Sequence, residues 1–254
     1  MSLPRTPSLR LDGRRALVSG GTRGIGLGAA TVLAEAGAHV TIAARTAADI
    51  DTAVAALEAR GLDADGVALD VTDVKAIASF IDAEAPYDIL VNSAGGARHA
   101  QFLDVTEADY EAILTLNLKS ALFLSQRVAK RLIAAGRPGS IIHISSQMGH
   151  VGGPKRTVYA ASKFAVEGLT KSMAIELGPH NIRVNTIAPT FVETEMSATS
   201  LSDPDFRSWV LGKIKLGRLA QVEDIMGPVL LLASDAGAMI TGSTVMVDGG
   251  WTAE

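Results

Sequence analysis

The sequence predicts an α/β fold in which helices cover both faces of a parallel sheet. Short apolar runs alternate with longer segments of helical periodicity along the whole chain, which is typical of successive strand–helix–strand units. The apolar runs are nearly continuous rather than alternating, as in strands that are buried on both sides. No internal repeat or break in composition divides the chain. We therefore expect a loose tail over residues 1–10 and a single domain over residues 11–254.

Composition narrows the classes of function. The 254 residues are 48% hydrophobic, which supports a sizeable core, and the net charge of −4 without a basic block argues against nucleic acid as a partner. The absence of cysteine excludes disulfides, thiolate nucleophiles and cysteine-based zinc sites, and the five histidines lack metal-ligand spacing, so we expect no metal site. Residues 1–15 lack the apolar core of a signal peptide, and no apolar run approaches membrane-spanning length. We expect no membrane partner and a cytoplasmic protein.

The first strand, residues 16–18, runs directly into a glycine-rich turn over residues 19–26. A helix over residues 27–36 follows, with Gly37 as the residue that ends it. Glycines at such a turn let a phosphate group approach the backbone, and the helix N-terminus offers free N–H groups to a pyrophosphate. The turn is not a Walker A motif, because Leu27 occupies the position at which that motif requires lysine. The turn alone is equally compatible with a tight connection that binds nothing.

The strand–helix rhythm continues to the middle of the chain. We expect strands over residues 39–43, 66–69 and 88–91, and helices over residues 48–60 and 77–84. Thr106 and Asp109 resemble a capping box that opens a long helix reaching residue 135. Asn117 lies within an apolar run of this helix, where a buried amide needs hydrogen-bonding partners. A purely structural role is the simpler interpretation of Asn117 taken alone.

The central stretch carries the strongest chemical signal. A strand over residues 140–144 leads through Ser146 and a glycine-rich loop to a helix over residues 159–177. Tyr159 and Lys163 are four residues apart and share a helix face, so the ammonium is expected to lower the pKa of the phenol towards neutrality. A phenol tuned in this way exchanges protons at neutral pH. A solvated surface pair is the alternative for these two residues alone.

The last third of the chain contains one long excursion. Strands are expected over residues 181–187 and 244–247, and a helix over residues 222–234 that contains Pro228. Residues 190–216 lie between them and carry Met196, Phe206 and Trp209. A segment of this length after a strand predicts a substrate lid, and a subunit contact is the alternative.

Taken together in this order, the motifs resemble the short-chain dehydrogenase/reductase (SDR) family over about residues 10 to 251. The resemblance implies a Rossmann-type doubly wound parallel sheet of about seven strands with helices on both faces. It also implies that Tyr159 is the general acid or base, that Lys163 lowers its pKa and holds the nicotinamide ribose, and that Ser146 binds the substrate oxygen. The implied catalytic set is Asn117, Ser146, Tyr159 and Lys163, with Asn117 anchoring a water beside Lys163.

The resemblance further implies two sets of binding residues. The cofactor would contact Gly20, Thr22, Arg23, Gly24, Ile25, Gly26, Arg45, Asp70, Val71, Asn92, Ala94, Gly95, Tyr159, Lys163, Pro189, Val192 and Thr194. The substrate would contact Ser146, Gln147, His150, Tyr159 and Met196. The chain departs from the usual family pattern at Ser19, at Thr190, where glycine is usual, and at Pro228.

The charge pattern after the second strand predicts NADP(H) in preference to NAD(H). Sites for NAD(H) usually place a carboxylate at the end of this strand, where it repels a 2′-phosphate. Here Ala44 takes that place and Arg45 follows it, and Arg23 in the glycine-rich turn is expected to approach the same phosphate. Either arginine alone is equally well explained as a solvated surface residue.

We therefore expect a metal-independent oxidoreductase that reversibly reduces a carbonyl to a secondary alcohol. Arg98, Gln147, His150 and Glu193 lie beside family pocket positions and favour a small sugar, sugar acid or polyol. The first alternative is a 3-oxoacyl-[acyl-carrier-protein] reductase, for which Arg137 is a docking candidate but His180 replaces a second expected arginine. The other is a non-enzymatic NADP-sensing or interaction protein. The resemblance also implies a homotetramer, through the helix around Asn117, the helix after Tyr159 and residues 247–251.

Overall fold

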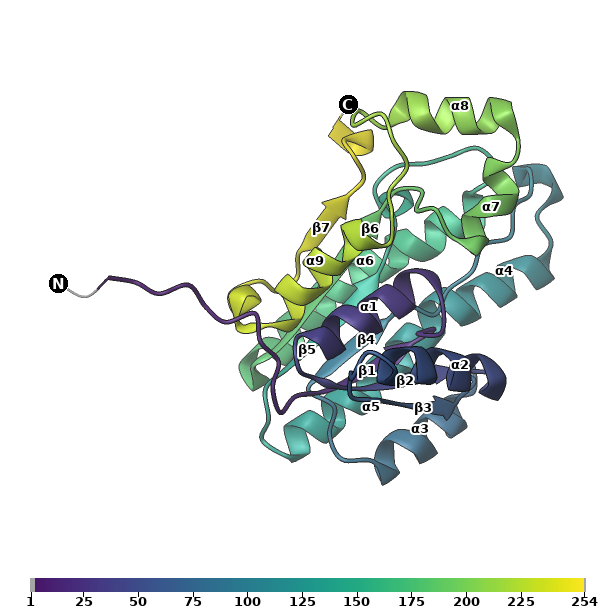
Figure 1. Cartoon of the computed structure of the whole chain (residues 1–254). Helices are drawn as coiled ribbons and strands as arrows, with labels where there is room; N and C mark the ends of the chain where they lie inside the picture. Colours follow the sequence, from purple (N-terminus) through teal and green to yellow (C-terminus); the bar gives the residue numbers. More distant parts are fainter. Residues whose placement is uncertain (1–2, 254) are drawn as a thin grey trace.

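The computed structural model describes residues 3–253 and contains a seven-stranded sheet in the order β3-β2-β1-β4-β5-β6-β7, with every neighbouring pair parallel (Figure 1). This confirms the predicted fold class. The strands are β1 (Arg15–Ser19), β2 (His39–Ala44), β3 (Ala64–Ala68), β4 (Ile89–Asn92), β5 (Gly139–Ile144), β6 (Ile182–Pro189) and β7 (Thr244–Val247). Residues 3–10 precede the sheet without regular secondary structure and are exposed.

Helices cover both faces because consecutive apolar residues of each strand point to opposite sides. Val18 faces a core formed with α1 (Gly24–Glu35), α2 (Ala47–Glu58) and α9 (Glu223–Ala233). Leu17 faces the other core, formed with α3 (Val74–Ala83), α5 (Ser120–Ala134) and α6 (Thr157–Leu177). The remaining elements are α4 (Glu107–Leu114), α7 (Glu195–Leu201), α8 (Pro204–Lys213), the π turn η2 (Thr115–Lys119) and the short 3₁₀ turns η1 (Phe102–Asp104), η3 (Gln147–Gly149), η4 (Gly178–His180), η5 (Asp235–Gly237) and η6 (Trp251–Ala253).

The long helix expected over residues 106–135 is interrupted. Thr106 caps α4 as expected, because its hydroxyl accepts a hydrogen bond from the Asp109 backbone N–H. The helix then widens into the π turn η2 before α5 begins, and Asn117 lies at the centre of that turn. π turns inside helices frequently occur at functional sites, because the extra residue per turn redirects a side chain.

The strand order reverses between β1 and β4, which opens a crevice at the carboxyl ends of these strands. The turn after β1 is packed tightly there. A Cβ on Gly20, whose φ is +68°, would lie 2.9 Å from Ala94 backbone atoms, and one on Gly26 would lie 2.1 Å from the Gly20 carbonyl oxygen. Both positions therefore require glycine, because the turn packs closely against the loop after β4 and against itself.

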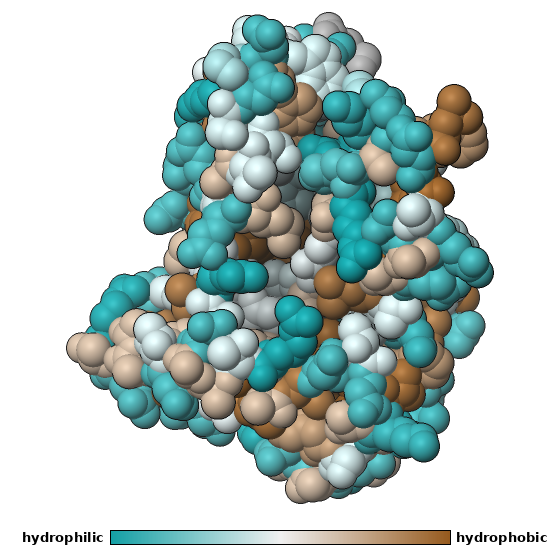
Figure 2. All heavy atoms as spheres, turned by 90° about the vertical axis from the view of Figure 1, so that its right-hand side faces the viewer, coloured by the Kyte–Doolittle hydropathy of each residue, from teal (hydrophilic) through white to brown (hydrophobic). Residues whose placement is uncertain are grey.

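The segment over residues 190–216 contains α7 and α8, which stand beyond the carboxyl edge of the sheet (Figure 1). Aromatic side chains join this segment to the C-terminal turn. Phe191 stacks on Trp251 at 5.9 Å between ring centroids, and Trp209 meets the same indole edge-on at 5.4 Å. Figure 2 shows that this side of the molecule is hollowed, with a paler and more apolar floor inside a hydrophilic rim.

None of the helices described here combines the length and apolar character needed to cross a bilayer. The expected cytoplasmic location stays a prediction.

Candidate active site

The corner between β5 and α6 brings three of the expected catalytic residues together. Ser146 lies just beyond the end of β5 and is buried, and Tyr159 and Lys163 lie in the first turns of α6, with Lys163 also buried. The Lys163 Nζ is 5.7 Å from the centre of the Tyr159 ring. A phenol, a hydroxyl and an ammonium thus share one partly desolvated corner at the carboxyl edge of the sheet.

Lys163 does not act on Tyr159 as the sequence predicts. Its Nζ donates a hydrogen bond to the Ile144 carbonyl oxygen at 2.8 Å, and burial lowers the pKa of Lys163 to about 8, against the opposing charge of Glu167. Burial raises the pKa of Tyr159, while Ser146 and the charge of Arg156 act in the opposite direction. The expected lowering of the Tyr159 pKa by Lys163 is therefore wrong for this geometry, because desolvation outweighs the nearby charges.

Ser146 is oriented by its neighbours. Its hydroxyl donates to Gln147 Oε1 at 2.7 Å and accepts from the Met148 backbone N–H at 3.1 Å. Gln147, an expected substrate contact, is therefore beside Ser146, and its side chain is also buried. An incoming carbonyl oxygen would have to replace Gln147 as the acceptor of the Ser146 proton.

Asn117 satisfies its whole amide within the protein. Its Oδ1 accepts from the Gly96 N–H at 2.9 Å, and its Nδ2 donates to the Gly96 carbonyl at 3.0 Å and to Ser162 Oγ at 3.0 Å. A Cβ on Gly95 would lie 3.3 Å from Asn117 Oδ1 and 3.8 Å from Lys163 Nζ, so both groups border the loop after β4. These contacts fit a structural role for Asn117. Its position beside Lys163 also agrees with the catalytic set that the family resemblance implies.

The residues around the crevice fit a dinucleotide. The first turn of α1 has no side-chain cap, which leaves its N–H groups available to a pyrophosphate. These positions, together with the ends of β2, β3 and β4, place the following expected cofactor contacts along one edge: Gly20, Thr22, Gly24, Ile25, Gly26, Arg45, Asp70, Val71, Asn92, Ala94 and Gly95.

Two of these residues are engaged elsewhere through their side chains. Asn92 donates to Ser125 Oγ at 2.9 Å and lies 3.1 Å from His143 Nδ1, so only its backbone faces the crevice. Burial, aided by the charge of Lys163, lowers the pKa of His143 to about 4, so this imidazole is neutral at pH 7. Asp70 accepts hydrogen bonds from the Thr72 N–H and hydroxyl, which lower its pKa.

The two arginines that are expected to bind a 2′-phosphate, Arg45 and Arg23, have different surroundings in the structure. Arg45 is exposed just after β2, and its charge contributes to the lowered pKa of Asp70, which follows the neighbouring strand β3. Arg23 instead forms an ion pair with Glu195 at 3.2 Å, which links the glycine turn to α7. Both ends of this pair are well exposed, so the contact is weak and easily exchanged.

The start of the expected lid closes over the glycine turn. Pro189 ends β6, Val192 pairs with Ala220, and Thr194 caps α7 with its methyl group 3.3 Å from the Cβ position of Gly24. Met196, an expected substrate contact on α7, is 65% exposed.

His150 lies beside a buried carboxylate. Its Nε2 is 3.4 Å from Glu167, whose other oxygen accepts hydrogen bonds from Thr186 and Thr244. The described contacts therefore connect His150 to the β6–β7 side of α6.

Sequence reasoning missed two residues near Tyr159. Arg156 is buried three positions before Tyr159, with its guanidinium 5.9 Å from the Phe191 ring centre and 5.7 Å from that of Phe206. The spacing of Tyr159 and Lys163 indicated those two residues alone. No pattern in the sequence indicated that Arg156 is buried. Ser162, the partner of Asn117, was also missed because it precedes Lys163 without a pattern of its own.

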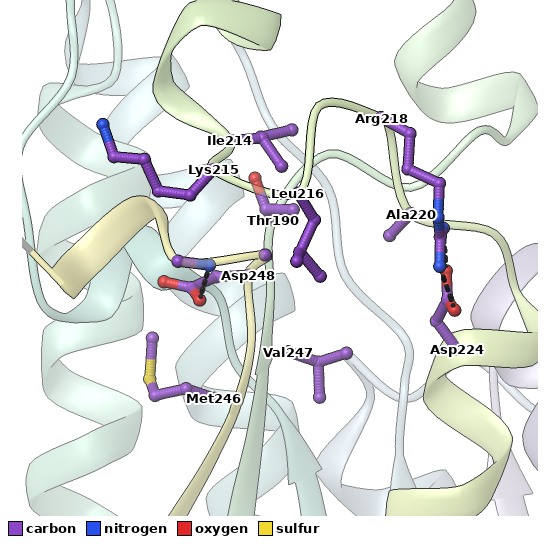
Figure 3. Close-up of a pocket in the computed structure, with 12 residues that line it drawn as sticks. Thr190, Ile214, Lys215, Leu216, Arg218, Ala220, Asp224, Met246, Val247 and Asp248 are labelled. Carbon is purple, nitrogen blue, oxygen red and sulfur yellow. Dashed lines mark hydrogen bonds and ion pairs between the residues drawn. The ribbon is translucent and has the colours of Figure 1, made fainter.

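A separate cavity of about 480 Å³ lies at the carboxyl ends of β6 and β7. Figure 3 shows Thr190, Ile214 and Leu216 on one side and Met246 and Val247 on the strand below, with Arg218 and Asp224 paired at its border. Thr190 Oγ1 is buried there without a hydrogen-bond partner among the described residues. None of the expected catalytic residues lines this cavity.

The fold and the site define a class of protein: a Rossmann-type fold with one crevice, flanked by a glycine turn and by Tyr159 with the buried Lys163. Residues 20–252 match a family model described as enoyl-(acyl carrier protein) reductase. The chain is 44% identical to L-xylulose reductase from Bos taurus over 96% of its length and 99% of that protein, and 42% identical to D-erythrulose reductase from Gallus gallus over 96% and 98%.

A solved gluconate 5-dehydrogenase from Burkholderia cenocepacia J2315, in complex with NADP and tartrate, aligns with a TM-score of 0.93 and 37% identity over 97% of this chain and 98% of that one. The chain belongs to the short-chain dehydrogenase/reductase family. It is accordingly an oxidoreductase that acts on CH–OH groups with a nicotinamide cofactor.

Proposed function

We propose that the protein reversibly reduces the carbonyl of a small sugar, sugar acid or polyol-derived ketone to a secondary alcohol, with NADP(H) as cofactor. The observation that carries this proposal is the corner that unites Ser146, Tyr159 and Lys163 beside a crevice fitted for a dinucleotide. The relatives support the substrate class, because they include L-xylulose reductase, D-erythrulose reductase and gluconate 5-dehydrogenase.

The cofactor supplies the hydride, and the residues of this chain position the substrate and move the proton. Ser146 would donate a hydrogen bond to the substrate oxygen in place of Gln147. With its raised pKa, Tyr159 is protonated at neutral pH, which is the form that gives a proton during reduction. A protonated Lys163 turned from Ile144 toward the phenol would stabilise the phenolate that remains, and would reach the nicotinamide ribose.

Asn117 would complete the set by holding the loop after β4 against α6. In this role Asn117 fixes the position of that loop beside Lys163. The family resemblance further implies that Asn117 binds a water molecule that links Lys163 to solvent. Residues 190–216 would act as the lid of a single domain, with the aromatic contact between Phe191 and Trp251 excluding water from the corner.

Two alternatives are less well supported. An acyl-carrier-protein reductase would need free basic residues for docking, whereas Arg137 is paired with the buried Asp88 at 2.6 Å. A non-enzymatic sensor would not need a buried ammonium beside a buried hydroxyl and a phenol, and such costly burial of a charge is typical of catalytic sites.

The reaction is tested by Tyr159→Phe in a screen of NADPH oxidation with ketosugars, keto sugar acids and 3-oxoacyl thioesters. The substitution removes the proton donor and leaves the ring packing, so kcat is expected to fall by about 10² or more. The matched control is Tyr110→Phe, which removes an exposed phenol from α4 and should leave the rate unchanged. Near wild-type turnover by Tyr159→Phe would refute the assignment, and wild-type activity on thioesters alone would refute the substrate class.

The preference for NADP(H) is proposed from Arg45. Ala44 leaves no carboxylate at the end of β2, and the guanidinium of Arg45, which follows it, suits a phosphate. Arg23 is expected to exchange Glu195 for the same phosphate, since the exposed ion pair holds it only weakly.

Arg45→Ala should therefore lower kcat/KM for NADPH by about 10-fold to 10²-fold and leave that for NADH nearly unchanged, because a charge-assisted hydrogen bond contributes about 1.5–3 kcal/mol. Both cofactors are measured with one substrate. Arg60→Ala, in the turn that follows α2, is the control for loss of one positive charge. An unaltered preference in Arg45→Ala would show that Arg45 does not bind the 2′-phosphate.

We also propose a homotetramer. β7 is an edge strand of the sheet and is only partly covered, and α6 exposes Phe164 and Ile175. Such surfaces are typical of subunit contacts. Light scattering at micromolar concentration should give about four times the 26.3 kDa chain mass. A monomeric mass would contradict this proposal.

A further inference from the structure

We infer that Arg156 binds the carboxylate of a sugar-acid substrate and thereby sets the preference of the site for sugar acids over neutral ketoses. The inference rests on the proposed function and specifies its substrate class. It starts from the contacts of Arg156, which is only 7% exposed. Among residues 3–253 no carboxylate pairs with its guanidinium, and its side-chain contacts are the faces of Phe191 and Phe206.

A buried guanidinium without a counter-ion is costly. Arginine stays protonated in proteins, so it cannot relieve the cost by losing its charge. The two aromatic faces recover part of this free energy through cation–π contacts. Several other arginines of this chain pair with carboxylates, as Arg137 does with Asp88 and Arg218 with Asp224, and the partly buried Arg131 and Arg183 donate to backbone carbonyl oxygens. The planar guanidinium of Arg156 can therefore bind a ligand carboxylate through two parallel hydrogen bonds.

The guanidinium is close to the reaction centre. Its charge acts on the Tyr159 phenol and, after the larger effect of desolvation, helps to lower the pKa of His99 to about 4. Arg156 is three residues before Tyr159 at the start of α6, and its charge also reaches His99 in the loop after β4. A substrate with its carbonyl at Tyr159 and an anionic group further along its chain would bring that group towards Arg156.

The local backbone presents Arg156 to the same space. Arg156 is the N-cap residue of α6, and no side chain caps the first turn, so the helix N-terminus adds positive potential. The preceding Lys155 has φ +59°, a left-handed conformation that non-glycine residues seldom adopt. The loop thus turns sharply before α6 and directs Arg156 inward beneath the aromatic side chains of the lid. Water excluded by these rings strengthens a guanidinium–carboxylate contact.

The competing interpretation is that Arg156 only supports the lid through its contacts with Phe191 and Phe206. The two roles differ in their consequences. A lid support affects every substrate alike, whereas a carboxylate-binding residue affects only acids. The effect of a substitution on an acidic and a neutral substrate therefore separates them.

The experiment compares wild type, Arg156→Gln and Arg156→Lys, with Arg60→Gln as the control for one lost charge. The substrates are 5-ketogluconate as the acid and L-xylulose as the neutral ketose, both with saturating NADPH. Arg156→Gln should lower kcat/KM for the acid by about 10-fold to 10²-fold, mainly through KM, and change that for L-xylulose less than about threefold. Arg156→Lys should keep part of the acid activity, because it retains the charge but not the fork.

A second measurement does not depend on turnover of the acid. Tartrate should inhibit L-xylulose reduction competitively in the wild type, and its inhibition constant should rise at least about tenfold in Arg156→Gln. Parallel losses on both substrates, or unchanged tartrate inhibition, would overturn the inference and leave the proposed function standing. A wild type that reduces neither substrate would overturn both.

Discussion

The structure depends on one unfavourable constraint, the burial of the Lys163 ammonium at the corner of β5 and α6. Its Nζ donates a hydrogen bond to the carbonyl oxygen of Ile144, the last residue of β5. The charge is therefore fixed at the end of that strand. Burial lowers the pKa of Lys163 to about 8 and that of the neighbouring His143 to about 4. Because a charge in this environment costs stability, its neighbours are hydroxyls, amides and a carboxylate, Glu167, that partly compensate it.

The same corner is supported from the C-terminal end of the chain. Asp248 accepts hydrogen bonds from the Gly250 and Thr252 N–H groups and from the Thr252 hydroxyl, which fixes the turn that carries Trp251. Trp251 in turn packs against Phe191 and Trp209 of the segment over residues 190–216. The chain thus brings its last turn, the expected lid and the start of α6 into one aromatic wall, and Arg156 lies against that wall.

Sequence periodicity predicted the order of strands and helices, because most strands are short apolar runs, but it did not predict the helices α7 and α8 within residues 190–216. It could not predict the π turn at Asn117, which depends on tertiary contacts with Gly96 and Ser162. Motif spacing brought Ser146, Tyr159 and Lys163 together, but the direction of the Tyr159 pKa was wrong because spacing does not report desolvation. Arg156 was missed for the same reason, since burial of a charged residue in a loop leaves no periodic signal.

The central claim is that Lys163 is kept for chemistry at a cost in stability, and Lys163→Met tests it directly. Since the pKa of Lys163 is lower in the folded chain than its ordinary 10.5, the cost is fully present below pH 8 and is relieved as pH rises towards 10.5. We predict that Lys163→Met increases the free energy of unfolding at pH 7 by about 1–3 kcal/mol, loses this advantage near pH 10, and reduces carbonyls at least about 10²-fold more slowly. A variant that is less stable than the wild type at pH 7 and retains its activity would contradict the account.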